Sequence, residues 1–175
     1  LYTGMRVGEL LALKWKNVDV KNGTIEISGT CYDDKSEEGG YKRVIGTPKT
    51  LSSCRTIPLP KQIIPLLREH GKGSNSEFVI VDEFDKPVGV RSYQKSFEIL
   101  LECIEMKKRC FHALRHTFAT RALECGMDVK TLSEILGHRN ATVTLNRYAH
   151  SLIEHKKEMM NRLGKSLWYQ QSPKK

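Results

Sequence analysis

The sequence has no apolar run long enough to cross a membrane and no charged-then-apolar leader at its start. Its five cysteines are odd in number and scattered, and none belongs to a Cys-x-x-Cys pair. Such a pattern argues against a disulfide framework and against a zinc ribbon. These absences exclude membrane-spanning and disulfide-stapled classes, and they lead us to expect a cytoplasmic protein with reduced thiols.

Two cofactor signatures are also missing. No Walker-type glycine-rich loop is present, so the sequence offers no loop of that kind for a nucleotide. His112 and His116 have a four-residue spacing that can hold zinc, but the adjacent glutamate of a zinc protease is absent. We therefore expect neither a cofactor nor a metal, and we interpret His116 as a structural residue or a support for a nearby site.

The composition is that of a globular, basic domain. With 175 residues, of which 39% are apolar, the chain suits one domain with a single core. Lys and Arg outnumber Asp and Glu by 29 to 20, which gives a formal net charge of +9 at pH 7. This charge favours a partner rich in phosphate, although a solvated cationic face would produce the same balance.

Helical spacing of apolar residues dominates the chain. It predicts helices at 6–15, 61–70, 90–106, 111–125 and 129–136. Gly126 and Gly137 are expected to end the last two of these helices, and Asp128 is expected to cap the last one. A further short helix is expected to lead to Tyr148.

Strand signals are fewer. Alternation predicts a strand at 24–28, after a turn signal. Two short runs, 41–47 and 55–59, flank a polar segment and predict a hairpin with a wide tip that carries Lys49. The acidic segment 33–40 is expected to be an exposed connection.

Several residues have the chemistry that breaking a phosphodiester requires. That reaction needs cationic donors for the non-bridging oxygens, a nucleophile, and a proton for the leaving oxygen. Arg6 and Arg115 suit a phosphate clamp because a guanidinium presents a rigid fork of donors and stays protonated. His112 and Arg115, three residues apart, share one helix face. A surface histidine and arginine would show the same spacing. The presence of His138 and Tyr148 further along the chain is what favours a catalytic site.

Four segments taken together resemble the motifs of the tyrosine recombinases, also called the phage integrase family. Gly4-Met-Arg-Val-Gly-Glu-Leu looks like the box around the first catalytic arginine, and His112-Ala-Leu-Arg-His-Thr-Phe-Ala-Thr is similar to the second box. Leu136-Gly-His138 with Asn146-Arg-Tyr148 resembles the third box. Pro48-Lys49-Thr, ahead of Ser53-x-Arg55-x-Ile57-Pro58, completes a match that spans nearly the whole chain in order.

The resemblance implies a role for each matching residue. Tyr148 would attack the scissile phosphorus, leaving a 3′-phosphotyrosyl bond and a free 5′-hydroxyl. Lys49 would protonate the departing oxygen, and His112 would handle the proton of the tyrosine. The transition state would be stabilised by Arg6, Arg115 and His138, with Glu9 orienting these groups. Because the covalent intermediate retains the energy of the broken bond, rejoining needs no ATP.

Other basic residues have two interpretations. They either contact the DNA backbone, where contacts position without specifying sequence, or are solvated. These residues are Lys42, Arg43, Arg55 and Arg139.

The resemblance also implies an α+β fold, mainly α-helical, with helices packed around a small antiparallel sheet. Residues 1–175 would form the catalytic domain, with 150–175 as a C-terminal tail. Because the first residue is Leu, we expect a C-terminal fragment of a longer protein, without the N-terminal DNA-binding domain. The partner would be double-stranded DNA, with self-association as a tetramer on DNA through the tail. The apolar face of that tail would otherwise pack on its own core.

Two other functions fit part of the pattern. A non-catalytic helix-turn-helix DNA-binding module would explain the charge and the glycine-ended helices near Gly126 and Gly137. It leaves the order of Arg6, His112 and Tyr148 unexplained. A type IB topoisomerase also attacks DNA with a tyrosine, but the small size and the tail favour a site-specific recombinase or integrase.

Overall fold

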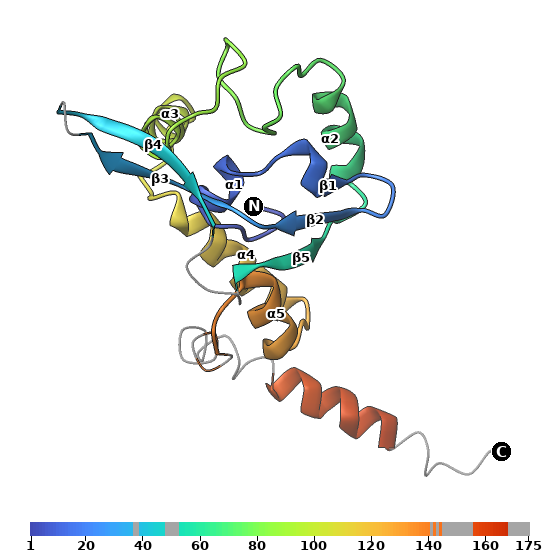
Figure 1. Ribbon diagram of the computed structural model, residues 1–175. Helices are drawn as coiled ribbons and strands as arrows, with labels where there is room; N and C mark the ends of the chain where they lie inside the picture. Colours follow the sequence, from blue (N-terminus) through green and yellow to red (C-terminus); the bar gives the residue numbers. More distant parts are fainter. Residues whose placement is uncertain (37–38, 48–52, 141, 143, 145–155, 168–175) are drawn as a thin grey trace.

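The computed structural model describes residues 1–36, 39–47, 53–140, 142, 144 and 156–167 (Figure 1). The helices of this part are α1 (Val7–Leu11), α2 (Ile63–Gly71), α3 (Val90–Cys103), α4 (His112–Glu124), α5 (Val129–Leu136) and a helix at 156–167, with a 3-10 turn at Trp15–Asn17. The strands are β1 (Val18–Asp19), β2 (Thr24–Ile27), β3 (Thr30–Lys35), β4 (Tyr41–Gly46) and β5 (Arg55–Pro58). All named pairings are antiparallel, which confirms the predicted α+β class. No helix in the described ranges is long and apolar enough to cross a membrane.

The strands form two small sheets, of which the β3–β4 pair extends to one edge of the domain (Figure 1). The first has the order β1-β2-β5 and the second pairs β3 with β4. In the first sheet Ile25 pairs with Ile57, and these residues and Ile27 are almost completely buried. The alternation expected for the strand at 24–28 is therefore confirmed, because every second side chain enters the core.

The predicted hairpin between 41–47 and 55–59 is wrong. The first of these runs pairs with β3, and the second pairs with β2. Cross-strand charge explains the pairing of β3 with β4, since Asp33 lies opposite Arg43 and Asp34 opposite Lys42. The acidic segment 33–40 is thus partly a strand, which corrects its interpretation as an exposed connection.

Asp33 also has a second role that its sequence pattern hides. Its carboxylate accepts hydrogen bonds from the backbone N–H groups of Val90 at 3.3 Å and Arg91 at 3.0 Å. These groups open α3 and have no partner within that helix. One acidic residue therefore fastens the β3–β4 hairpin to α3.

The first helix is shorter than the spacing predicted. It ends at Leu11, and the residues that follow leave the helix for contacts with the segment around Phe78. Trp15 donates its backbone N–H to Glu77 O at 2.9 Å, and Leu13 O accepts from Val79 N at 2.9 Å. These long-range backbone bonds replace the helical ones that a local pattern suggested.

Helices α4 and α5 form a separate apolar cluster below β5 (Figure 1). The cluster contains Ala119, Leu123, Leu132 and Leu136, with Phe118 packed against it. Its two helices are ended and capped as expected. Gly126 and Gly137 have φ of 89° and 63°, and the Asp128 side chain accepts from Thr131 N at 2.9 Å.

Leu132→Ala is expected to lower the free energy of unfolding by about 2–5 kcal/mol, because a fully buried leucine leaves a cavity when truncated. Denaturant unfolding followed by circular dichroism measures the change. Leu66→Ala is the matched control, since Leu66 is 65% exposed on α2, and it should change stability by no more than about 0.5 kcal/mol. Equal losses in the two variants would contradict this assignment of the core.

Candidate active site

The C-terminal end of α5 is the point where distant parts of the chain converge. The last carbonyls of a helix have no partner inside it, and the helix dipole makes this end attractive to cations. Three arginines from α4, from the start of β5 and from the residue before α1 occupy it. Their donors and acceptors are Arg55 Nε to Ile135 O at 2.5 Å, Arg115 Nη2 to Leu136 O at 2.7 Å, and Arg6 Nη2 to Gly137 O at 3.1 Å.

Arg115 is fixed more tightly than a surface arginine. Only 5% of the residue is exposed, and Nη1 donates to Gly4 O at 2.7 Å. Gly4 adopts a φ of 60°, and a Cβ there would lie 2.4 Å from the Phe118 ring. Only glycine fits this turn against α4, so the turn before Arg6 is held by the same arginine that closes α5.

His138 follows directly after the turn that ends α5. Its Nε2 lies 2.9 Å from Arg115 Nη2, and its Nδ1 lies 2.6 Å from Thr144 Oγ1. An arginine can only donate, so Nε2 accepts and Nδ1–H donates to the threonine hydroxyl. Thr144 is fully buried and was missed by the sequence analysis. No sequence signal marked it, because a single threonine six residues after His138 fits many roles.

Glu9 joins two of the arginines. It is 4% exposed, and it accepts from Arg6 N at 2.9 Å and from Arg6 Nη1 at 2.7 Å. Arg55 Nη1 and Nη2 donate to its two carboxylate oxygens at 3.1 and 2.9 Å. Burial by itself raises the pKa of Glu9, but the hydrogen bonds and charge of Arg55 and the bonds from Arg6 outweigh burial. The pKa of Glu9 therefore lies below its ordinary value.

Arg55 does not match either of its two interpretations. Its side chain is only 7% exposed, and its guanidinium donates to acceptors of the protein, including Ser53 O at 3.1 Å. It is neither solvated nor presented outward for DNA. A period-2 signal existed, because Arg55 and Ile57 fall on the same side of β5 and Ile57 is core.

The remaining basic residues that were considered for DNA contact differ in their exposure. Lys42 and Arg139 are exposed, whereas Arg43 is half-buried with its guanidinium 5.6 Å from the centre of the Phe78 ring. Part of the Arg43 side chain thus lies near an aromatic ring of the fold, and its contact with DNA stays a prediction.

His112 lies at the first residue of α4, one turn before Arg115, and is exposed. Its ring meets that of His116 edge to face, with centroids 4.6 Å apart and an interplanar angle of 90°. Arg6 is 39% exposed at its side chain and so is accessible from outside. Two predicted residues, Lys49 and Tyr148, lie outside the described residues. The structure thus brings Arg6, Arg115 and His138 together, with His112 on the same helix as Arg115.

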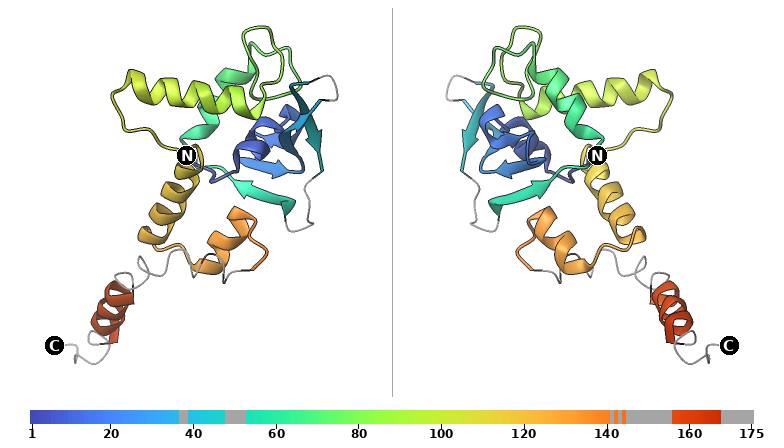
Figure 2. Two further views of the ribbon diagram at one scale, coloured as in Figure 1. Left: turned by 90° about the vertical axis from the view of Figure 1, so that its left-hand side faces the viewer. Right: turned by 90° about the vertical axis from the view of Figure 1, so that its right-hand side faces the viewer.

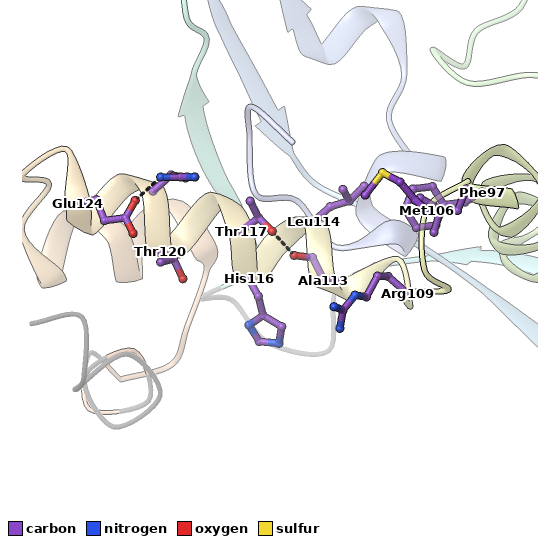
Figure 3. A pocket seen from close by; sticks show the side chains of 11 residues that line it. Phe97, Met106, Arg109, Ala113, Leu114, His116, Thr117, Thr120 and Glu124 are labelled. Atoms are coloured by element: carbon purple, nitrogen blue, oxygen red, sulfur yellow. Dashed lines mark hydrogen bonds and ion pairs between the residues drawn. The ribbon is translucent and has the colours of Figure 1, made fainter. Parts of the chain in front are cut away.

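A separate cavity of about 570 Å³ lies along α4, and Arg115 does not line it (Figure 3). It is bordered by Phe97 and Leu101 of α3, by Met106, and by Leu114 and His116 of α4. Figure 3 shows His116 and Thr120 on one side of α4. Among the described residues no group of three His, Cys, Asp or Glu side chains could hold a metal ion.

The sequence matches the model of the phage integrase family over residues 1–155. The chain belongs to the phage integrase family. A tyrosine recombinase XerC-like protein of Caldanaerobacter subterraneus subsp. tengcongensis is 33% identical, and the match covers 93% of this chain and 46% of that protein. The integrase of Staphylococcus phage L54a is 31% identical over 95% of this chain and 50% of its own length. The chain thus spans about half the length of these family members.

The solved structure of an integrase has a similar fold. The Tn1549 transposon integrase in complex with transposon right end DNA superposes with a TM-score of 0.77 at 30% identity. The match covers 93% of this chain and 56% of that one. The arginine-bound end of α5 therefore lies in a domain that has the fold of a phage integrase family member.

The lowered pKa of Glu9 makes stability depend on pH. The carboxyl titrates near 4.5 when unfolded and lower when folded, so its contribution is present above pH 4.5 and is lost as the pH falls through the folded value. Glu9→Gln is expected to lower the free energy of unfolding by about 1–3 kcal/mol at pH 7, with a smaller difference below pH 4.5. Denaturant unfolding at several pH values measures this.

Glu124→Gln is the control, because Glu124 pairs with Arg121 at 2.9 Å but has a side chain that is 47% exposed. An exposed ion pair contributes little, so this variant should follow the wild-type curve. A Glu9→Gln curve parallel to that of the wild type would show that Glu9 does not couple to folding.

Proposed function

We propose that this chain is the catalytic domain of a site-specific DNA recombinase, which cleaves and rejoins double-stranded DNA through a 3′-phosphotyrosyl intermediate. The observation that carries the proposal is the convergence of Arg6, Arg115 and His138 at the end of α5. Donors fixed in advance can stabilise charge that develops on a phosphate without reorganising during the reaction. Because the proposed substrate is DNA, the proposed place of action is the cytoplasm.

In this proposal the arginines bind the non-bridging oxygens of the scissile phosphate. Arg115 is rigid and Arg6 is partly exposed, so the pair offers one buried and one accessible donor group. Tyr148 attacks the phosphorus and becomes bonded to the 3′-phosphate. A tyrosine has an ordinary pKa of about 10, so it needs a base and a cationic pocket to react near neutrality. His112 receives the tyrosine proton, and Lys49 protonates the 5′-oxygen as it leaves.

The geometry supports this reaction over a helix-turn-helix binding module. A recognition helix presents its polar side chains to a groove. In this fold Arg115 is buried and spends its donors on Gly4, Leu136 and His138. A buried arginine held in this way does not face a DNA groove, which argues against a role in base reading.

Tyr148→Phe is expected to abolish the covalent adduct, because phenylalanine lacks the attacking oxygen. The full-length protein is incubated with a nicked duplex that carries its recombination site, and adducts are separated by denaturing electrophoresis. Arg6→Ala and Arg115→Ala should also lower the adduct yield, while DNA binding persists. An adduct formed by Tyr148→Phe would disprove this nucleophile. A wild-type protein that binds the duplex but leaves it uncut, with binding unchanged in both arginine variants, would support a binding module.

The same experiment separates a recombinase from a topoisomerase. Two DNA duplexes of different length, each with the site, yield products of new length only when strands change partners. Relaxation of a supercoiled plasmid without any such product would favour a type IB topoisomerase.

We further propose that the C-terminal helix mediates self-association, with a tetramer on DNA as the active form. Met160, Leu163 and Leu167 are 65%, 49% and 51% exposed and occupy one face of the helix at 156–167. Figure 2 shows this helix pointing away from the body of the domain. The exposure of these side chains in the described part of the tail supports packing against a second copy rather than against the core of the same domain.

Leu163→Glu is expected to weaken association of protomers on DNA about tenfold or more, because burying a leucine contributes about 1.5–3 kcal/mol. Sedimentation of the full-length protein with a DNA site measures the number of protomers bound. Asn161→Glu adds the same charge to another face of the helix and should leave assembly unchanged. Equal assembly of Leu163→Glu and wild type would contradict the proposed interface.

A further inference from the structure

We propose that Arg55 is a positioning residue of the active site, which holds Arg6 through Glu9 and holds His138 through the end of α5. This inference rests on the proposed function. It concerns a residue that touches neither the phosphate nor the nucleophile in the proposed reaction.

The contacts of Arg55 use every nitrogen of its guanidinium. Nε donates to Ile135 O at 2.5 Å, Nη1 donates to Ser53 O and to Glu9 Oε1 at 3.1 Å each, and Nη2 donates to Glu9 Oε2 at 2.9 Å. The two bonds to Glu9 form the planar, bidentate geometry that fixes a carboxylate in direction as well as in place. A lysine keeps the charge but cannot reach these acceptors together, since an ammonium is a point donor.

Glu9 transmits this geometry to Arg6. The side chain of Arg6 is 39% exposed, and it donates to Glu9 Oε1 at 2.7 Å and to Gly137 O at 3.1 Å. Without Arg55, the buried carboxylate of Glu9 would lose two of its four donors and would be held only by the backbone N–H and Nη1 of Arg6 itself. Arg6 would then lose the fixed direction that a phosphate clamp requires.

Arg55 also sets the other anchor of Arg6. A Cβ at Gly137 would lie 2.7 Å from Arg55 Nη1, so the turn that ends α5 is seated against the guanidinium. The residue after this turn is His138. A single buried side chain thus determines both the accessible arginine and the histidine that lies 2.9 Å from Arg115.

The test compares two scissile groups in the full-length protein. One nicked duplex has a normal phosphodiester, and the other has a methylphosphonate, in which a neutral methyl replaces one charged oxygen. The neutral group depends less on arginine clamps for its transition state. The variants are Arg55→Lys and Arg55→Met, and single-turnover cleavage, DNA affinity and thermal unfolding are measured for each.

We expect Arg55→Lys to bind DNA within about threefold of the wild type and to cleave the phosphodiester about 100-fold more slowly, the loss typical of slight misplacement. Cleavage of the methylphosphonate should fall less than about tenfold, because the clamp matters less there. Arg121→Met is the matched control. Arg121 is 77% exposed, pairs with Glu124 at 2.9 Å, and should leave both rates unchanged.

Each result decides the matter. Equal slowing on both substrates by Arg55→Lys would overturn the inference, since general loosening of the fold does not distinguish a charged from a neutral group. Wild-type rates in a folded Arg55→Lys would also overturn it while leaving the proposed function intact. If Arg55→Met does not fold, Arg55→Lys alone decides. A wild-type protein that forms no adduct with either substrate would remove the proposed function, and this inference with it.

Discussion

The last carbonyl oxygens of α5 have no hydrogen-bond donor within the helix, and the rest of the site depends on the donors that they accept from instead. A turn at Gly137 with a φ of 63° stops the helix. Three arginines from well-separated parts of the sequence meet these oxygens there. The contacts that satisfy the helix end are therefore the same contacts that arrange the donors of the site. The three arginines cannot be placed independently of the helix end that they bond.

Among the described residues, the cluster at the end of α5 contains three arginines but one carboxylate, that of Glu9. Arg55 and Glu9 are both almost fully buried and compensate one another, with bidentate bonds that repay part of their desolvation. Arg6 also bonds to Glu9, while Arg115 bonds to backbone oxygens and to His138. One carboxylate thus pairs with two of the three arginines, and a positive excess remains at the end of α5. This local excess is more informative than the net charge of the whole chain.

The sequence could predict what depends on local pattern or on recognisable motifs. Asp128 and Gly137 mark the two ends of α5 because capping and left-handed turns have strong residue preferences. That Arg6, Arg115 and His138 lie together could be predicted, because each belongs to a motif of the family and the motifs occur in the family's order. Strand pairing was not, because β4 and β5 are close in sequence but find better partners elsewhere.

The burial of the Arg55 side chain was not predicted from the sequence for a related reason. The alternation in β5 places Arg55 on the same side as the core residue Ile57, but it does not say whether a basic side chain there meets DNA or an internal carboxylate. Its partner Glu9 lies 46 residues away, and no local rule connects the two. The same holds for Thr144, whose contact with His138 appears only when the chain has turned after α5.

Backbone acceptors give the site an uneven tolerance to change. The oxygens of residues 135–137 are present whatever side chains those positions carry, so a point substitution cannot delete them. An insertion or deletion between Asp128 and Gly137 is different, because each added residue rotates the helix by about 100° and moves its end by about 1.5 Å. The acceptor half of this site is therefore encoded in the length of α5 rather than in its composition.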